Sequence, residues 1–89
     1  MDEAVQSAAA KLVRRLRKGN YTITVAESCT GGLLASTLTD IAGASAYFQQ
    51  SWVTYANEAK VKELGVSSDT LEKRGAVSAN LAIHMAQGA

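Results

Sequence analysis

Two short segments of the sequence carry side chains that could do chemistry together. Residues 25–32, VAESCTGG, place a hydroxyl and a thiol, Ser28 and Cys29, directly after a β-branched stretch. Residues 55–60, YANEAK, begin with Tyr55 and end with Lys60. A serine hydroxyl is a weak nucleophile until a neighbouring base takes its proton, and a neutral lysine can be that base. These residue types therefore suggest nucleophilic catalysis, with Tyr55 at a strand end to orient the lysine or to relay a proton.

The VAESCTGG segment is predicted to be the turn from a strand into a helix. Residues 21–26 are rich in β-branched side chains, and residues 30–41 carry apolar residues at helical spacing. A helix N terminus presents unpaired N–H groups and the positive end of the helix dipole. The N–H groups near Gly31 and Gly32 could therefore hold an oxyanion or a phosphate. Alternatively, the turn is a helix cap whose glycines allow tight packing, which explains these residues equally well. In that case Cys29 is expected to be a small buried side chain.

Lys60 is predicted in the first turn of a helix that Asn57 caps. The positive end of the helix dipole disfavours an ammonium group there, so this is a poor place for a lysine chosen for stability alone. A solvated lysine is the simpler alternative. Glu27 could also pair with Lys60 and keep it charged. Ser45 adds a second hydroxyl in the loop after the second predicted helix, although loop serines are usually turn formers.

The remaining pattern predicts a small α/β domain. Helices are predicted over residues 3–18, 30–41, 57–64, 68–75 and 78–89, and strands over residues 21–26 and 47–55. Ser68 and Asp69 are expected to begin the fourth helix, and Ser78 is expected to cap the fifth. Two strands make a marginal sheet, and the last helix carries an apolar stripe to its end. We therefore expect that further elements complete this domain.

Composition excludes several classes of protein. The 89 residues fit one domain, and a net charge of +1 predicts neither a nucleic-acid nor a membrane partner. The single cysteine, Cys29, excludes an internal disulfide and fits a reducing cytoplasm. The acidic N terminus differs from a signal peptide, and no apolar run approaches the roughly 20 residues of a membrane span. His84 has no partner at metal-ligand spacing, so we expect no metal.

Three blocks of the sequence resemble the C-terminal domain of the competence/damage-inducible CinA proteins. In order they are TVAESCTGGLLASTLTDIAGAS, WVTYANEAKVKELGV and GAVSANLAIHMAQGA, and the similarity runs from about residue 5 to residue 89. The resemblance implies a three-layer α/β/α domain over residues 1–89, truncated to about two strands and five helices and incomplete at its C-terminal end. Stand-alone members are nicotinamide-nucleotide amidases. The implied reaction converts the carboxamide of nicotinamide mononucleotide to nicotinate mononucleotide and ammonia, without metal or cofactor.

The resemblance also implies a set of site residues. The family's Ser-Tyr-Lys machinery falls on Ser28, Tyr55 and Lys60, and Ser45 matches a further pocket hydroxyl that competes as the nucleophile. Ser28 or Ser45 would attack the amide carbon, and Lys60 would take the serine proton. Tyr55 would orient Lys60 or pass the proton to the departing ammonia. The expected substrate-binding positions are Glu27, Thr30, Gly31, Gly32 and Asn57.

Three functions compete at this point. The first is an amidase whose active site is completed either by self-association or by further residues of a longer polypeptide. The second is a truncated, non-catalytic module that acts in binding or assembly. The third is a nucleic-acid-associated factor that uses the cations near the end of the first helix, Lys11, Arg14, Arg15, Arg17 and Lys18, but the net charge argues against it. We expect a cytoplasmic homo-oligomer that covers the open sheet edge and the apolar helix faces.

Overall fold

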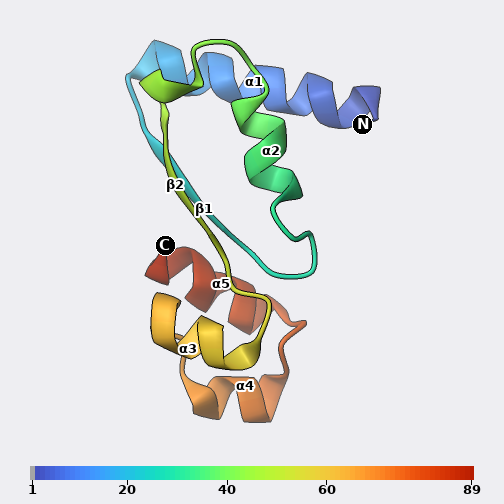
Figure 1. Ribbon diagram of the computed structural model, residues 1–89, viewed down its shortest axis with the longest axis vertical. Helices are drawn as coiled ribbons and strands as arrows, with labels where there is room; N and C mark the ends of the chain where they lie inside the picture. Colours follow the sequence, from blue (N-terminus) through green and yellow to red (C-terminus); the bar gives the residue numbers. More distant parts are fainter. Residues whose placement is uncertain (1) are drawn as a thin grey trace.

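The computed structural model describes residues 2–89 and shows five α-helices, a short 3-10 helix and two strands (Figure 1). The helices are α1 (Glu3–Gly19), α2 (Leu33–Thr39), α3 (Asn57–Leu64), α4 (Ser68–Arg74) and α5 (Ala79–Gly88). The strands are β1 (Ile23–Glu27) and β2 (Phe48–Val53), and the 3-10 helix η1 (Ala44–Ala46) leads into β2. The predicted α/β class, with two strands and five helices, is confirmed. No helix among these residues is long and apolar enough to cross a bilayer.

The two strands pair in parallel, with Ile23 opposite Phe48 and Glu27 opposite Val53. A parallel pair needs a crossover connection, and α2 with η1 supplies it. Figure 1 shows α1 near the amino ends of the strands and α3, α4 and α5 gathered at their carboxyl ends. Residues that follow β1 and β2 therefore meet at one edge of the sheet, next to the last three helices.

Two apolar clusters cover the two faces of the strands. The α1–α2 cluster contains Ala9, Val13, Leu16, Val25, Leu38 and Tyr47. The α3–α5 cluster contains Leu64, Val66, Leu81 and Met85, with Ala26 and Trp52 packed against it. Val25 and Ala26 belong to different clusters because successive side chains of a strand point to opposite faces. The short sheet is therefore sandwiched between two groups of helices.

The helix ends test the predicted caps. The side chain of Ser78 caps α5 as predicted, because it accepts a hydrogen bond from the N–H of Leu81. Helix α4 begins at Ser68 as predicted, and Ser67 occupies its N-cap. Ala56 takes the N-cap of α3 without a side-chain bond, so the prediction that Asn57 caps this helix is wrong.

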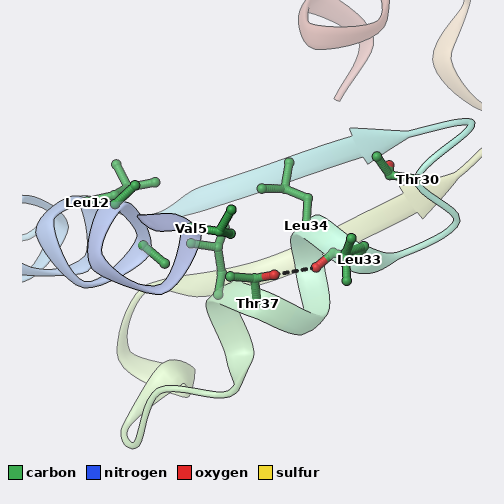
Figure 2. Close-up of a pocket in the computed structure, with 9 residues that line it drawn as sticks. Val5, Leu12, Thr30, Leu33, Leu34 and Thr37 are labelled. Atoms are coloured by element: carbon green, nitrogen blue, oxygen red, sulfur yellow. Dashed lines mark hydrogen bonds between the residues drawn. The ribbon is translucent and has the colours of Figure 1, made fainter. Parts of the chain in front are cut away.

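An apolar groove of about 330 Å³ lies between α1 and α2 (Figure 2). Val5 and Leu12 come from α1, and Leu33 and Leu34 come from α2. The hydroxyl of Thr37 donates to the carbonyl of Leu33 at 2.7 Å, so this polar atom is bonded within α2. All four large apolar side chains are exposed. Exposed apolar patches of this kind mark interaction surfaces in many proteins.

The change Tyr47→Phe is expected to lower the free energy of unfolding by about 1–2 kcal/mol. Tyr47 is 1% exposed, and its hydroxyl donates to the carbonyl of Leu38 near the end of α2 at 2.7 Å. Phenylalanine keeps the ring in the α1–α2 cluster but removes the donor from this buried carbonyl. Urea unfolding measures the change. Tyr21→Phe is the control, because Tyr21 is exposed and should change stability by less than about 0.5 kcal/mol. Equal effects at the two positions would contradict the prediction.

Candidate active site

The turn after β1 carries Ser28 to the carboxyl edge of the sheet. Helix α2 begins at Leu33 and ends at Thr39, so the helix predicted over residues 30–41 is shorter at both ends. Gly31 and Gly32 precede it with φ angles of 62° and 108°. Glycine adopts these left-handed conformations without steric cost, and the N–H of Gly31 closes the turn onto the carbonyl of Ser28 at 2.9 Å. The two glycines therefore shape the turn that holds Ser28.

Glu27, the last residue of β1, holds the N terminus of α2. Its side chain is buried and accepts hydrogen bonds from the Thr30 hydroxyl at 2.7 Å and the Leu34 N–H at 2.8 Å. The N–H of Ala35 donates to the second carboxylate oxygen at 3.0 Å. Burial alone would raise the pKa of Glu27. The hydrogen bonds from Ala35, Leu34, Thr30 and Gly32 outweigh it and lower the pKa. Glu27 is therefore a buried anion at the positive end of α2.

The N terminus of α2 is occupied by the chain's own carboxylate. The N–H of Gly32 hydrogen-bonds to Glu27, and the N–H of Gly31 donates to the carbonyl of Ser28. The prediction that N–H groups near Gly31 and Gly32 hold an oxyanion or a phosphate is therefore wrong, because these groups already have acceptors. Glu27 and Thr30 bond to each other and build the turn, and their predicted contact with substrate stays a prediction.

Lys60 is buried in the first turn of α3. Its side chain is 1% exposed, and Nζ donates to the carbonyl of Tyr55 at 2.8 Å. A solvated lysine is therefore excluded. The salt bridge found within residues 2–89 joins Lys73 to Asp69, and no salt bridge joins Lys60 to Glu27 there. The alternative in which Glu27 keeps Lys60 charged is wrong, because the carboxylate of Glu27 is directed at α2.

One cavity of about 390 Å³ brings three of the predicted catalytic residues together. Ser28, Tyr55 and Lys60 line it at the carboxyl edge of the sheet, where both strands end. Its other lining residues are Cys29, Ala76, Val77, Ser78, Ala82 and Met85. Most of these come from α5 and the loop before it, which the sequence analysis did not place at the site. The side chain of Tyr55 is largely exposed, so it is at the mouth of the cavity.

Ser45 does not join this cavity within one chain. It is exposed on η1, before β2, whereas Ser28 follows β1. Parallel strands place these two positions at opposite edges of the sheet. At about 3.3 Å per residue, β2 separates Ser45 from the cavity by roughly 20 Å. The prediction that Ser45 competes as the nucleophile therefore does not hold within a single chain. The sequence already contains this information, because Ser28 follows the first predicted strand and Ser45 precedes the second.

Asn57 also lies apart from the cavity. It is exposed at the start of α3 and lines a separate hollow with Leu71 and Glu72 of α4. Ala56 is the N-cap of α3, and Asn57 is the first residue of the helix. Its predicted contact with substrate is not supported by this placement.

Two further reactive side chains were considered in the sequence. Cys29 is exposed and lines the cavity beside Ser28, so the expectation of a small buried side chain is wrong. His84 lies on α5 and is half-buried. No three histidine, cysteine or carboxylate side chains gather as metal ligands in the part of the chain that the structure describes. Cys29 is therefore a thiol that shares the cavity with a buried amine.

Comparisons with known proteins agree on one family. The model of the CinA C-terminal domain matches residues 5–89. A CinA-like protein of Fervidobacterium nodosum is 60% identical over 74 residues, which are 83% of this chain and 18% of that protein. A CinA-like protein of Shewanella denitrificans is 53% identical over 87 residues, which are 98% of this chain and 20% of that protein.

Solved structures show the same similarity. The competence/damage inducible protein CihA of Agrobacterium tumefaciens matches with a TM-score of 0.90 and 44% identity, over 96% of this chain and 52% of that chain. A CinA superfamily protein of Escherichia coli matches with a TM-score of 0.91 and 39% identity, over 96% and 49%. The chain thus spans about a fifth of the length of the curated relatives and about half of these solved chains.

Proposed function

This chain belongs to the CinA C-terminal domain family, and we propose that it acts as a nicotinamide-nucleotide amidase. The proposed reaction hydrolyses the carboxamide of nicotinamide mononucleotide and releases nicotinate mononucleotide and ammonia. One observation carries the proposal. Ser28, Tyr55 and Lys60 line a single cavity, and the amine of Lys60 is buried there against a backbone carbonyl.

The proposed mechanism uses these three residues in sequence. Lys60 is the base that takes the proton of Ser28, and the serine oxygen attacks the carboxamide carbon. The tetrahedral intermediate collapses as the C–N bond breaks, and Tyr55 at the cavity mouth passes to the departing ammonia the proton that Lys60 took from Ser28. An ester to Ser28 remains. Water then attacks this ester, with Lys60 again as the base, and restores the serine hydroxyl.

A second function, binding without turnover, is favoured by a different observation. The N–H groups expected to stabilise a developing oxyanion are already bonded to Glu27 and Ser28. Stabilisation of that charge is usually the largest single contribution to acyl-transfer catalysis. A cavity with a nucleophile and a base but without these donors would bind a nucleotide and hydrolyse it slowly. The second candidate is therefore a nucleotide-binding module.

Ammonia release from nicotinamide mononucleotide tests both functions on the purified protein. The amidase predicts equal amounts of ammonia and nicotinate mononucleotide, and it predicts that Ser28→Ala loses turnover while still binding the nucleotide in calorimetry. Ser7→Ala, at an exposed position on α1, should keep the wild-type rate. Binding without ammonia from the folded wild type would establish the module and overturn the amidase. Neither binding nor turnover would overturn both.

A further inference from the structure

The exposed side of α1 carries a concentration of positive charge. Five of the nine lysines and arginines of the chain lie within residues 11–18, and no aspartate or glutamate lies between Glu3 and Glu27. Four of these cations are exposed and are spaced three and four residues apart, which places them on one side of the helix. This cation stripe consists of Lys11, Arg14, Arg15 and Lys18. The buried side of α1, with Val13 and Leu16, is the opposite one.

The stability of α1 does not explain the cation stripe. Like charges four residues apart destabilise a helix, and the stripe contains two such pairs. The helix dipole favours cations only in the last turn, which among the four includes Lys18 alone. No salt bridge found in the described part of the chain involves the stripe. Arg17, the fifth cation, is already engaged, because its guanidinium hydrogen-bonds to the carbonyl of Ala42. The four side chains of the stripe are therefore available to an anionic partner.

An aromatic ring extends the cation stripe. Tyr21 follows α1, and its side chain is 66% exposed. A Cβ atom added to Gly19 would clash with Cε2 of Tyr21, so the ring lies where a side chain at position 19 would project. Position 19 comes four residues after Arg15 and is therefore its neighbour on the helix surface. The ring thus adjoins the row of cations.

We propose that the cation stripe and Tyr21 bind single-stranded nucleic acid without sequence preference. Proteins that bind single strands in this way combine cations that follow the phosphates with exposed aromatic rings on which bases stack. Arginine suits phosphate because its planar guanidinium can form two parallel hydrogen bonds. The net charge of +1 does not oppose this partner, because residues 57–74 carry equal numbers of cations and anions and leave the excess on α1.

Two other polyanions fit this side of α1 less well. A helix that binds at a membrane surface buries a row of large apolar side chains in the headgroup layer. The exposed apolar residues of α1, Val5 and Leu12, line the groove toward α2 instead. A nucleic-acid duplex offers phosphates to the cations, but its bases are already stacked within the duplex and leave none for Tyr21. A single strand uses both features.

The proposed site lies away from the cavity of the proposed amidase. Figure 1 shows α1 at the amino ends of the strands, whereas Ser28, Tyr55 and Lys60 line a cavity at the carboxyl ends. Binding of nucleic acid therefore does not depend on amide hydrolysis. A binding measurement tests this site whatever the outcome for ammonia release.

Fluorescence anisotropy measures binding of a labelled single-stranded oligonucleotide of about 12 nucleotides, within the site sizes of single-strand binders. Four phosphate contacts predict a slope of about −2.8 for log K against log salt, which is about a 50-fold loss of affinity between about 50 and about 200 mM salt. Arg14→Gln combined with Arg15→Gln leaves two contacts and should reduce the slope to about −1.4. Lys62→Gln combined with Arg74→Gln removes the same charge from exposed positions on α3 and α4, and should leave the slope unchanged and the affinity within twofold.

Tyr21→Ala tests the stacking contact. It should lower the affinity at least fivefold, because one stacked base is lost, and it should keep the salt slope, because no charge is removed. Tyr21→Phe keeps the ring and should stay within twofold of the wild type. Circular dichroism shows whether each variant is folded, and the substituted residues are all exposed.

Three results would overturn the proposal. The first is no binding by the folded wild type at low salt, or equal losses in the two double variants. The second is equal affinity for the duplex of the same sequence together with wild-type binding by Tyr21→Ala, which would remove the ring from the site. The third is binding of phosphatidylserine vesicles without binding of the oligonucleotide, which would assign the cation stripe to a membrane surface.

Discussion

Replacing Lys60 with methionine is expected, under the proposed amidase function, to lower the rate of ammonia release from nicotinamide mononucleotide by about 1,000-fold, the range expected for loss of a general base. Lys60 is the amine that lines the cavity with Ser28, and its side chain is 1% exposed. Methionine fills much of the same space without the amine, so the loss should appear in kcat while the fold remains. A continuous ammonia assay at saturating substrate measures it.

Lys62→Met provides the matched control for this prediction. Lys62 lies on the same helix, α3, but is exposed to solvent, so its loss should change kcat by less than twofold. Circular dichroism of both variants shows whether the fold is kept. A folded Lys60→Met protein with wild-type activity would contradict the role of Lys60 as the base.

The change Glu27→Ala is expected to lower the free energy of unfolding by about 3 kcal/mol. Its carboxylate accepts from the Thr30 hydroxyl and from the N–H groups of Leu34 and Ala35. Hydrogen bonds to a charged group contribute about 1.5–3 kcal/mol, and donors left without an acceptor add a desolvation cost. Gly32 at the N-cap of α2 has no side chain to replace these bonds. Chemical denaturation at neutral pH measures the loss.

The stabilisation by Glu27 should also depend on pH. Hydrogen bonding holds the pKa of Glu27 below its usual value of 4.5, although burial opposes this. The stabilisation is therefore fully present above pH 4.5 and is lost as the pH falls through the lower pKa of the folded state. Glu27→Ala removes this dependence, so its unfolding free energy should approach that of the wild type in acid.

An exposed carboxylate supplies the comparison for Glu27. Asp69 forms an exposed ion pair with Lys73 at 3.2 Å, and such pairs contribute little, so Asp69→Ala should cost less than about 1 kcal/mol. It should also keep the acid dependence of the wild type. An unchanged dependence in Glu27→Ala would show that Glu27 is not the group that titrates.

The features predicted correctly from the sequence are those that local interactions determine. Apolar spacing and β-branched composition placed both strands and all five helices, because each pattern is complete within its own element. The Ser78 cap was found for the same reason, since its acceptor and donor lie three residues apart. Ser28, Tyr55 and Lys60 follow or adjoin the carboxyl ends of parallel strands, so their shared cavity is a consequence of topology.

The predictions that failed depend on contacts between distant elements. Helix α2 starts late because its cap is the side chain of Glu27, seven and eight residues before the N–H groups that it accepts from. No cap motif within the helix signals this arrangement. The anion site predicted at Gly31 and Gly32 was wrong for the same reason. The carboxylate of Glu27 and a carbonyl within the turn already accept hydrogen bonds from the N–H groups of these glycines. Ser45 lies far from Ser28 because Ser45 precedes β2 whereas Ser28 follows β1, and the two strands are parallel.

The packing of Trp52 determines what fluorescence can report about this protein. Trp52 is the single tryptophan of the sequence, and it packs against the α3–α5 cluster. Its emission therefore reports on the face of the sheet that α3, α4 and α5 cover. Far-ultraviolet circular dichroism, in contrast, reports on all five helices, because α1 and α2 contribute 24 residues (17 and 7) and α3, α4 and α5 contribute 25 (8, 7 and 10). Loss of tryptophan emission before loss of the circular dichroism signal would therefore indicate that the α3–α5 side opens first.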